Sequence, residues 1–146
     1  MKPFLPIFTL LFLLSLTACD SYEPNSLLPN AQVDFTVDMN LPQYQALLIP
    51  GGYVFVQNQG IRGVYIYNLN NSTYKAFDAA CPGIAASPQQ ACAQMNLLDG
   101  ILLECPCNGN TYSILDGSPQ QEGNAYVAKE YSALKNGPNS LRIRNF

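Results

Sequence analysis

The stretch Cys105-Pro106-Cys107-Asn108-Gly109 places two thiols in a tight loop, an arrangement that can present sulfur to a metal or to another cysteine. Cysteine and histidine commonly share such sites, but Asn108 stands where a histidine could complete the ligand set. The chain contains no histidine at all, so no imidazole can serve as a base, a proton shuttle or a metal ligand. The chemistry open to this loop is therefore thiolate ligation or disulfide formation.

The N-terminal sequence indicates export. Lys2 precedes an apolar run over residues 4–16, which is shorter than the roughly 20 residues of a spanning helix and suits a secretory signal. The run ends in Leu16-Thr17-Ala18-Cys19, which resembles the lipobox of bacterial lipoproteins. This resemblance implies an acylated Cys19, carrying palmitate or a similar chain, and a protein held on a membrane of the bacterial cell envelope, facing the periplasm or the cell surface. The alternative is an ordinary cleaved signal followed by an incidental cysteine.

Length and composition indicate one exported domain. We expect a signal peptide over residues 1–18, a tether with two prolines over residues 19–30, and one folded domain over residues 31–146. Seven Lys or Arg against ten Asp or Glu give a formal net charge of −3, and without a basic patch nucleic acid is not an expected partner. Once Cys19 is assigned to the anchor, four cysteines remain in the exported domain, namely Cys81, Cys92, Cys105 and Cys107. The compartment outside the cytoplasm is oxidising, so an even number of cysteines favours disulfides, and three pairings are possible.

The apolar pattern predicts an all-β domain. Val33, Phe35 and Val37 alternate with polar residues, which is the period of a half-buried strand. Only residues 41–49 could form a short helix. Many short strands separated by turn signals favour a small antiparallel sandwich or barrel. The expected strands are residues 32–37, 53–57, 63–68, 73–78, 101–104, 111–114 and 140–144.

The order of these features resembles the Rieske family, whose small antiparallel β fold holds a [2Fe–2S] cluster between two loops. In that family the first loop has the pattern C-x-H and the second the pattern C-P-x-H-G. Here the first loop matches at Cys81-Pro82-Gly83, and the second at Cys105-Pro106-Cys107-Asn108-Gly109. The resemblance, which covers about two thirds of the chain, implies a Rieske-like fold from residue 53 onward.

The same comparison shows which cluster ligands the chain lacks. A Rieske centre uses two cysteines on one iron and two histidines on the other. Cys81 and Cys105 match the cysteine ligands, but Gly83 and Asn108 occupy the histidine positions, so a standard Rieske cluster cannot form on this chain alone. Cys107 matches a further cysteine that high-potential members join by a disulfide to the first loop. The resemblance therefore favours Cys81 paired with Cys105, and Cys107 paired with the shifted Cys92.

Three uses of the sulfurs follow. Two structural disulfides would replace the cluster in ordering the loops, with no catalytic residue and no metal. The first alternative is an all-cysteine [2Fe–2S] cluster or a zinc site, and the second is a redox-active thiol pair, although C-x-x-C spacing is absent. Without histidine, no common catalytic triad can be assembled. We therefore expect a non-enzymatic binding or accessory module, with an envelope protein as a possible partner, and as the alternative a [2Fe–2S] electron carrier whose centre is all-cysteine or completed by a partner.

Overall fold

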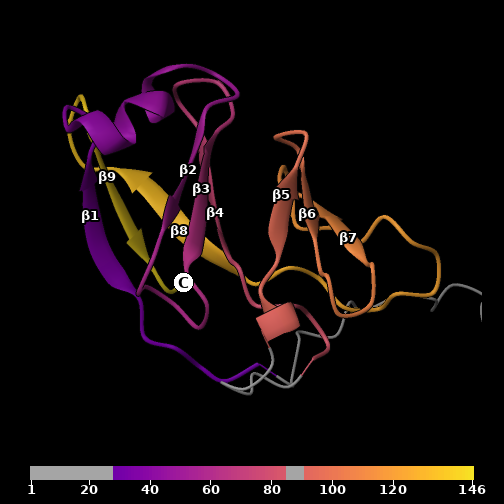
Figure 1. Ribbon diagram of the computed structural model, residues 1–146. Helices are drawn as coiled ribbons and strands as arrows, with labels where there is room; N and C mark the ends of the chain where they lie inside the picture. Colours follow the sequence, from indigo (N-terminus) through magenta and orange to yellow (C-terminus); the bar gives the residue numbers. More distant parts are fainter. Residues whose placement is uncertain (1–27, 85–90) are drawn as a thin grey trace, which may run out of the picture.

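The computed structural model describes residues 28–84 and 91–146, and its strands pair antiparallel throughout (Figure 1). The predicted all-β class is confirmed. The strands are β1 (Asp34–Asp38), β2 (Tyr53–Val56), β3 (Val64–Asn68), β4 (Tyr74–Asp78), β5 (Asn96–Leu98), β6 (Leu102–Glu104), β7 (Thr111–Ser113), β8 (Glu130–Lys135) and β9 (Ser140–Arg144), and the 3-10 helices are η1 (Pro42–Leu48) and η2 (Ala91–Ala93).

Two sheets make up the described part of the chain. The larger sheet has the strand order β1-β9-β8-β4-β3-β2 and curls, so that β8 passes behind β2, β3 and β4 while β9 and β1 stand to their left (Figure 1). The smaller sheet has the order β5-β6-β7 and stands beside the β4 side of the larger one (Figure 1). The chain leaves the larger sheet at the end of β4 and returns to it at the start of β8. Because β4 and β8 pair with each other, the two connections between the sheets lie side by side at the larger sheet.

Strand β3 lies at the centre of the fold, with all five of its residues buried. Because side chains alternate across a strand, Val64 and Ile66 pack into the core enclosed by the curled larger sheet. Tyr65 and Tyr67 point the other way, into a second core that they share with the smaller sheet and with Cys81 and Cys105. The cysteine loops are thus built onto an apolar core and are not appended to the surface.

The structure differs from the sequence-based expectation in two strands and one helix. Strands β5 and β8 were not expected, because the run Asn96-Leu97-Leu98 of β5 is short and contains no β-branched or aromatic residue, and β8 lacks a clean alternation of buried and exposed positions. The helix expected over residues 41–49 is a 3-10 helix that buries Leu47. The signal peptide, Cys19 and most of the tether lie outside the described residues, and of the tether's residues 28–30, Leu28 is buried. In residues 28–84 and 91–146, no helix has the length and apolar character needed to cross a membrane.

Candidate functional site: two loops joined by disulfides

The first loop leaves β4 at Asp78 and is fixed by backbone hydrogen bonds on both sides. The Ala79 N–H donates to Gly63 O at 2.8 Å, which ties the loop to the turn before β3. The Cys81 N–H donates to Ala93 O at 2.8 Å, and the Met95 N–H donates to Ala79 O at 2.6 Å. The position of Cys81 is therefore set by segments that precede and follow it in the chain.

The second loop joins β6 to β7 and closes on itself. The Gly109 N–H donates to Cys105 O at 2.8 Å, and the Cys105 N–H donates to Asn110 O at 2.8 Å. The Asn108 side-chain oxygen accepts the Asn110 N–H at 3.0 Å. This compact turn holds Cys105 inside and carries Cys107 and Asn108 toward the surface.

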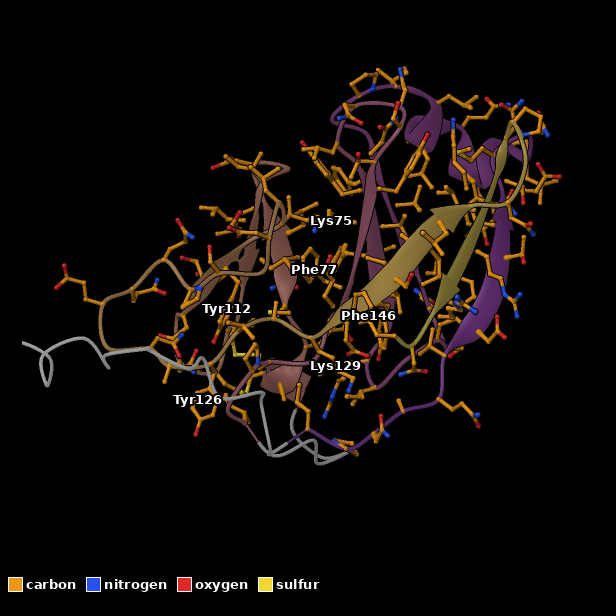
Figure 2. All side chains as sticks on the ribbon, turned by 180° about the vertical axis from the view of Figure 1, so that it is seen from behind. Lys75, Phe77, Tyr112, Tyr126, Lys129 and Phe146 are labelled. Carbon is orange, nitrogen blue, oxygen red and sulfur yellow. A yellow bond between two sulfur atoms is a disulfide. The ribbon has the colours of Figure 1, made fainter. Side chains whose placement is uncertain are left out.

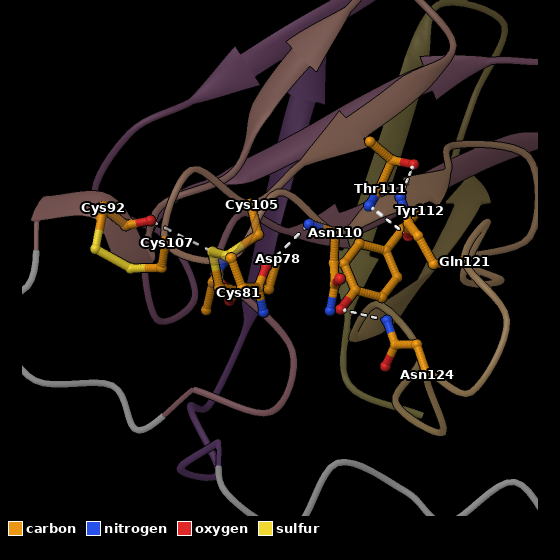
Figure 3. The surroundings of a disulfide bond; sticks show 12 residues. Asp78, Cys81, Cys92, Cys105, Cys107, Asn110, Thr111, Tyr112, Gln121 and Asn124 are labelled. Atoms are coloured by element: carbon orange, nitrogen blue, oxygen red, sulfur yellow. Dashed lines mark hydrogen bonds between the residues drawn. A yellow bond between two sulfur atoms is a disulfide. The ribbon is translucent and has the colours of Figure 1, made fainter.

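Two disulfides connect the loops, and they differ in burial (Figure 3). Cys81 is bonded to Cys105 across a Cα–Cα distance of 5.4 Å, and both residues are at most 1% exposed. Cys92 is bonded to Cys107 across 4.9 Å, with Cys92 exposed and Cys107 half-buried. The Cys81 sulfur lies 3.5 Å from the Cys92 carbonyl oxygen, so the bonds are neighbours. These are the two pairs that the Rieske resemblance favoured.

Asp78 anchors the start of the first loop. Its carboxylate is fully buried and accepts the N–H groups of Ile61 at 2.6 Å and Arg62 at 3.2 Å from the turn between β2 and β3. It also accepts the Ala80 N–H at 2.8 Å and the Tyr131 hydroxyl of β8 at 2.7 Å. A buried charge is stable only when hydrogen bonds replace its lost hydration, and Asp78 has four such donors. One side chain thereby joins three segments around the loop.

Two neighbours of Asp78, Tyr131 and Gly60, accommodate its buried carboxylate. Burial, followed by the charge of the adjacent Asp78 carboxylate, raises the pKa of Tyr131 well above its ordinary value. The phenol therefore stays protonated and remains a donor to the carboxylate. Gly60 has a φ of +66°, and a Cβ there would lie 2.3 Å from an oxygen of Asp78, so only glycine leaves room for this carboxylate.

Gly83, which stands at a histidine position of the Rieske pattern, packs against an aromatic ring. Its φ is +73°, and a Cβ added to it would lie 2.6 Å from the nearest ring carbon of Tyr126. Tyr126 lies at the loop end of the smaller sheet (Figure 2). The tyrosine ring therefore occupies the space into which a side chain at position 83 would have to extend.

A pocket of about 280 Å³ lies between the two histidine positions of the Rieske pattern. Gly83 borders it from the first loop and Asn108 from the second, so it lies at the place where the pattern would put the cluster's outer ligands. Its remaining wall comes from the segment between β7 and β8. The lining residues are 82–83, Asn108, Asn110, 121–124 and Tyr126.

The structure brings the predicted site residues together, with the exception of Cys19, which lies outside the described residues. The sequence analysis missed Asp78 and Tyr126. Asp78 had a possible signal in the sequence, since its carboxylate directly follows the apolar residues Ala76 and Phe77 at the end of a predicted strand. Tyr126 lies in a segment without secondary structure, and no pattern in the sequence linked it to Gly83.

Comparison by sequence finds no known protein family and no characterised protein that matches the chain. Comparison by structure finds small domains that align with most of it. A chain in the complex of reduced oxygenase and oxidized ferredoxin in carbazole 1,9a-dioxygenase is 17% identical, with a TM-score of 0.48, covering 77% of this chain and 94% of that one. The ferredoxin of carbazole 1,9a-dioxygenase from Nocardioides aromaticivorans IC177 is 14% identical, with a TM-score of 0.46, covering 80% and 100%. The E. coli protein NirD is 14% identical, with a TM-score of 0.43, covering 76% and 98%.

The residues at the site do not fit a Rieske cluster. Cys81 and Cys105 are bonded to each other, Gly83 has no side chain, and Asn108 offers an amide in place of an imidazole. Among residues 28–84 and 91–146, no group of three or more Cys, Asp or Glu side chains is arranged to hold a metal ion. What the arrangement does provide is a rigid pair of loops with a pocket between them.

Replacing Gly83 with histidine is expected to lower the free energy of unfolding by about 2–4 kcal/mol, because the new side chain meets the Tyr126 ring and the backbone has a positive φ. Asn108→His is the matched control. Its side chain is exposed, so the change should stay within about 1 kcal/mol. Urea denaturation of both variants measures the difference. Equal stability of the two would show that Tyr126 does not fill the space beside position 83.

Proposed function

We propose that this protein is a lipid-anchored module of the bacterial cell envelope, with a Rieske-like domain in which two disulfides have replaced the iron–sulfur cluster, and that it works by binding and not by electron transfer. The observation that carries this proposal is the Cys81–Cys105 bond. These cysteines match the cluster ligands of the Rieske pattern, and in the structure they are bonded to each other inside the core. A disulfide that is buried in this way acts as a structural link between the loops.

The arrangement of the two loops supports a binding function. Both are held rigidly by backbone hydrogen bonds, and both contribute to one pocket at the surface. A rigid scaffold that presents short loops is a common arrangement for recognition sites. An envelope protein or a small molecule could occupy this surface, and the anchor at Cys19 would keep the module beside a membrane.

The proposal is tested on full-length protein purified from membranes without oxygen or reductant. We expect no visible absorption, no stoichiometric iron or sulfide, and no free thiol at the four cysteines of the loops. A peptide map should link Cys81 to Cys105 and Cys92 to Cys107, as in the structure. A brown protein with stoichiometric iron and sulfide would overturn the proposal in favour of an all-cysteine or partner-completed electron carrier.

The anchor gives a separate prediction. Cys19→Ser should release the protein from the membrane fraction, because acyl chains on this residue would supply most of the membrane affinity. Fractionation of cells that express the wild type and the variant measures the effect. Wild-type protein that stays wholly in the soluble fraction after the membranes are pelleted would contradict the anchor, whatever the state of the disulfides.

A further inference from the structure

The pocket between the loops has a lining dominated by neutral polar groups. Four of the residues that line it carry amide side chains, namely Asn108, Asn110, Gln121 and Asn124. Within the described part of the chain, Glu122 is the only charged residue that lines the pocket, and no Lys or Arg does so. The pocket therefore lacks the cations that would attract phosphate or carboxylate ligands.

Hydrogen bonds hold two of these amides in fixed positions (Figure 3). Gln121 accepts the Thr111 N–H at 2.9 Å and donates to the Thr111 hydroxyl at 2.9 Å. Asn124 donates to the Tyr112 hydroxyl at 3.1 Å and accepts the Tyr126 N–H at 3.1 Å. Because Tyr112 is itself fully buried, the wall of the pocket is attached to the core. A wall that is already ordered loses little entropy when a ligand binds.

Other polar groups of the pocket have no hydrogen-bond partner in the part of the chain that the structure describes. Among residues 28–84 and 91–146, the Asn110 side chain makes no hydrogen bond, and Asn108 uses its oxygen but not its NH₂ group. The Tyr126 hydroxyl is likewise without a bond to these residues. An amide carries both donors and an acceptor, so these groups match a ligand whose hydroxyls can donate and accept.

Tyr126 adds a flat surface to this polar set. Gly83 packs against its ring, which orients the tyrosine, and the half-buried side chain still lines the pocket. Aromatic rings present a large apolar face with a polar tip. A ligand that combines an apolar face with a rim of hydroxyls meets both features at once.

We propose that this pocket binds a neutral sugar residue, with its ring against Tyr126 and its hydroxyls on Asn108 and Asn110. The proposal rests on the binding function proposed above and names the ligand class of the same site. A volume of about 280 Å³ is near the lower end of ordinary ligand pockets, roughly 300 Å³, which suits one sugar ring or the end unit of a glycan. A peptide is disfavoured because the lining residues lie in loops, without a strand edge to pair with its backbone.

Saturation-transfer NMR on the full-length protein in detergent tests the proposal. The probes are glucose, galactose, N-acetylglucosamine and the β-1,4-linked dimers of glucose and N-acetylglucosamine. We expect transfer to the ring protons of at least one of them. Asn110→Ala should weaken that binding about tenfold, because it removes hydrogen bonds to hydroxyls and disturbs no side-chain bond to residues 28–84 or 91–146. Tyr126→Ala should weaken it at least as much.

Asn136→Ala is the matched control, since it makes the same change in the exposed turn between β8 and β9, and it should bind as the wild type does. Inorganic phosphate and a trialanine peptide are the comparison ligands. The proposal is overturned if no sugar binds, if Asn110→Ala binds as tightly as the wild type, or if phosphate or the peptide binds through Asn110 instead. These measurements are independent of the iron and thiol assays. The sugar-binding proposal can therefore be overturned while the proposal that the domain holds no cluster is kept.

Discussion

Replacing Cys81 and Cys105 together with alanine is expected to lower the free energy of unfolding by about 4–5 kcal/mol, the largest effect of any change at the loops. Two costs add up. The Cys92–Cys107 bond still links the loops, so the lost bond closes a ring of roughly 15 residues or fewer, worth about 3 kcal/mol. Removing two fully buried sulfurs also leaves a cavity in the core, which costs about 1–2 kcal/mol more.

The pair Cys92→Ala and Cys107→Ala is the matched control. It removes a bond of similar ring size, but Cys92 is exposed and Cys107 half-buried, so little cavity remains. We expect a loss of about 3 kcal/mol for this pair. Urea denaturation under non-reducing conditions measures both variants. A greater loss for the exposed pair would contradict the view that the Cys81–Cys105 bond is the one built into the core.

Asp78→Ala is expected to lower the free energy of unfolding by about 3–5 kcal/mol, because it leaves four hydrogen-bond donors around a buried site without their acceptor. Tyr131→Phe is the graded comparison. It removes a single donor, and with three donors left on the carboxylate the loss should be about 1.5–3 kcal/mol.

Denaturation of the two variants gives these values, and hydrogen exchange locates the effect. The amides of Ile61 and Ala80, which donate to Asp78, should exchange faster in Asp78→Ala than in Tyr131→Phe. If both variants were equally stable, the carboxylate would not be the group that joins the turn after β2, the first loop and β8. The prediction would also fail if exchange at these two amides were unchanged.

These expectations share one structural origin. The disulfides hold the two loops to each other, and Asp78 holds the first loop to the larger sheet. In a metal-bound site the ion supplies part of this order, since binding of the metal contributes to folding. Here covalent bonds and a buried carboxylate order the same region, and the pocket between Gly83 and Asn108 is kept open at its surface.

Much of the fold could be predicted from local sequence. The alternation of Val64 and Ile66 with Tyr65 and Tyr67 indicates a strand with two apolar faces, and the structure gives each face its own core. Turn residues also act locally. Asn58, Asn71 and Asp99 all adopt positive φ, a conformation that asparagine and aspartate tolerate in turns. Strand β5 escaped prediction because Asn96-Leu97-Leu98 contains no β-branched or aromatic residue, whereas the predicted runs over residues 101–104 and 111–114 contain Ile101 and Tyr112.

The sequence by itself determined what chemistry this protein lacks and where its sulfurs lie along the chain. A chain without histidine cannot supply imidazole ligands. The two loop motifs place Cys81 and Cys105 at positions that resemble the cysteine-ligand positions of the Rieske pattern. Only the tertiary structure decided which side chains pack against Asp78 and Gly83. Tyr131 reaches Asp78 across 53 positions, and Tyr126 reaches Gly83 from a segment without regular structure. Such contacts depend on the path of whole loops over the core, and local propensity and periodicity carry no information about that path.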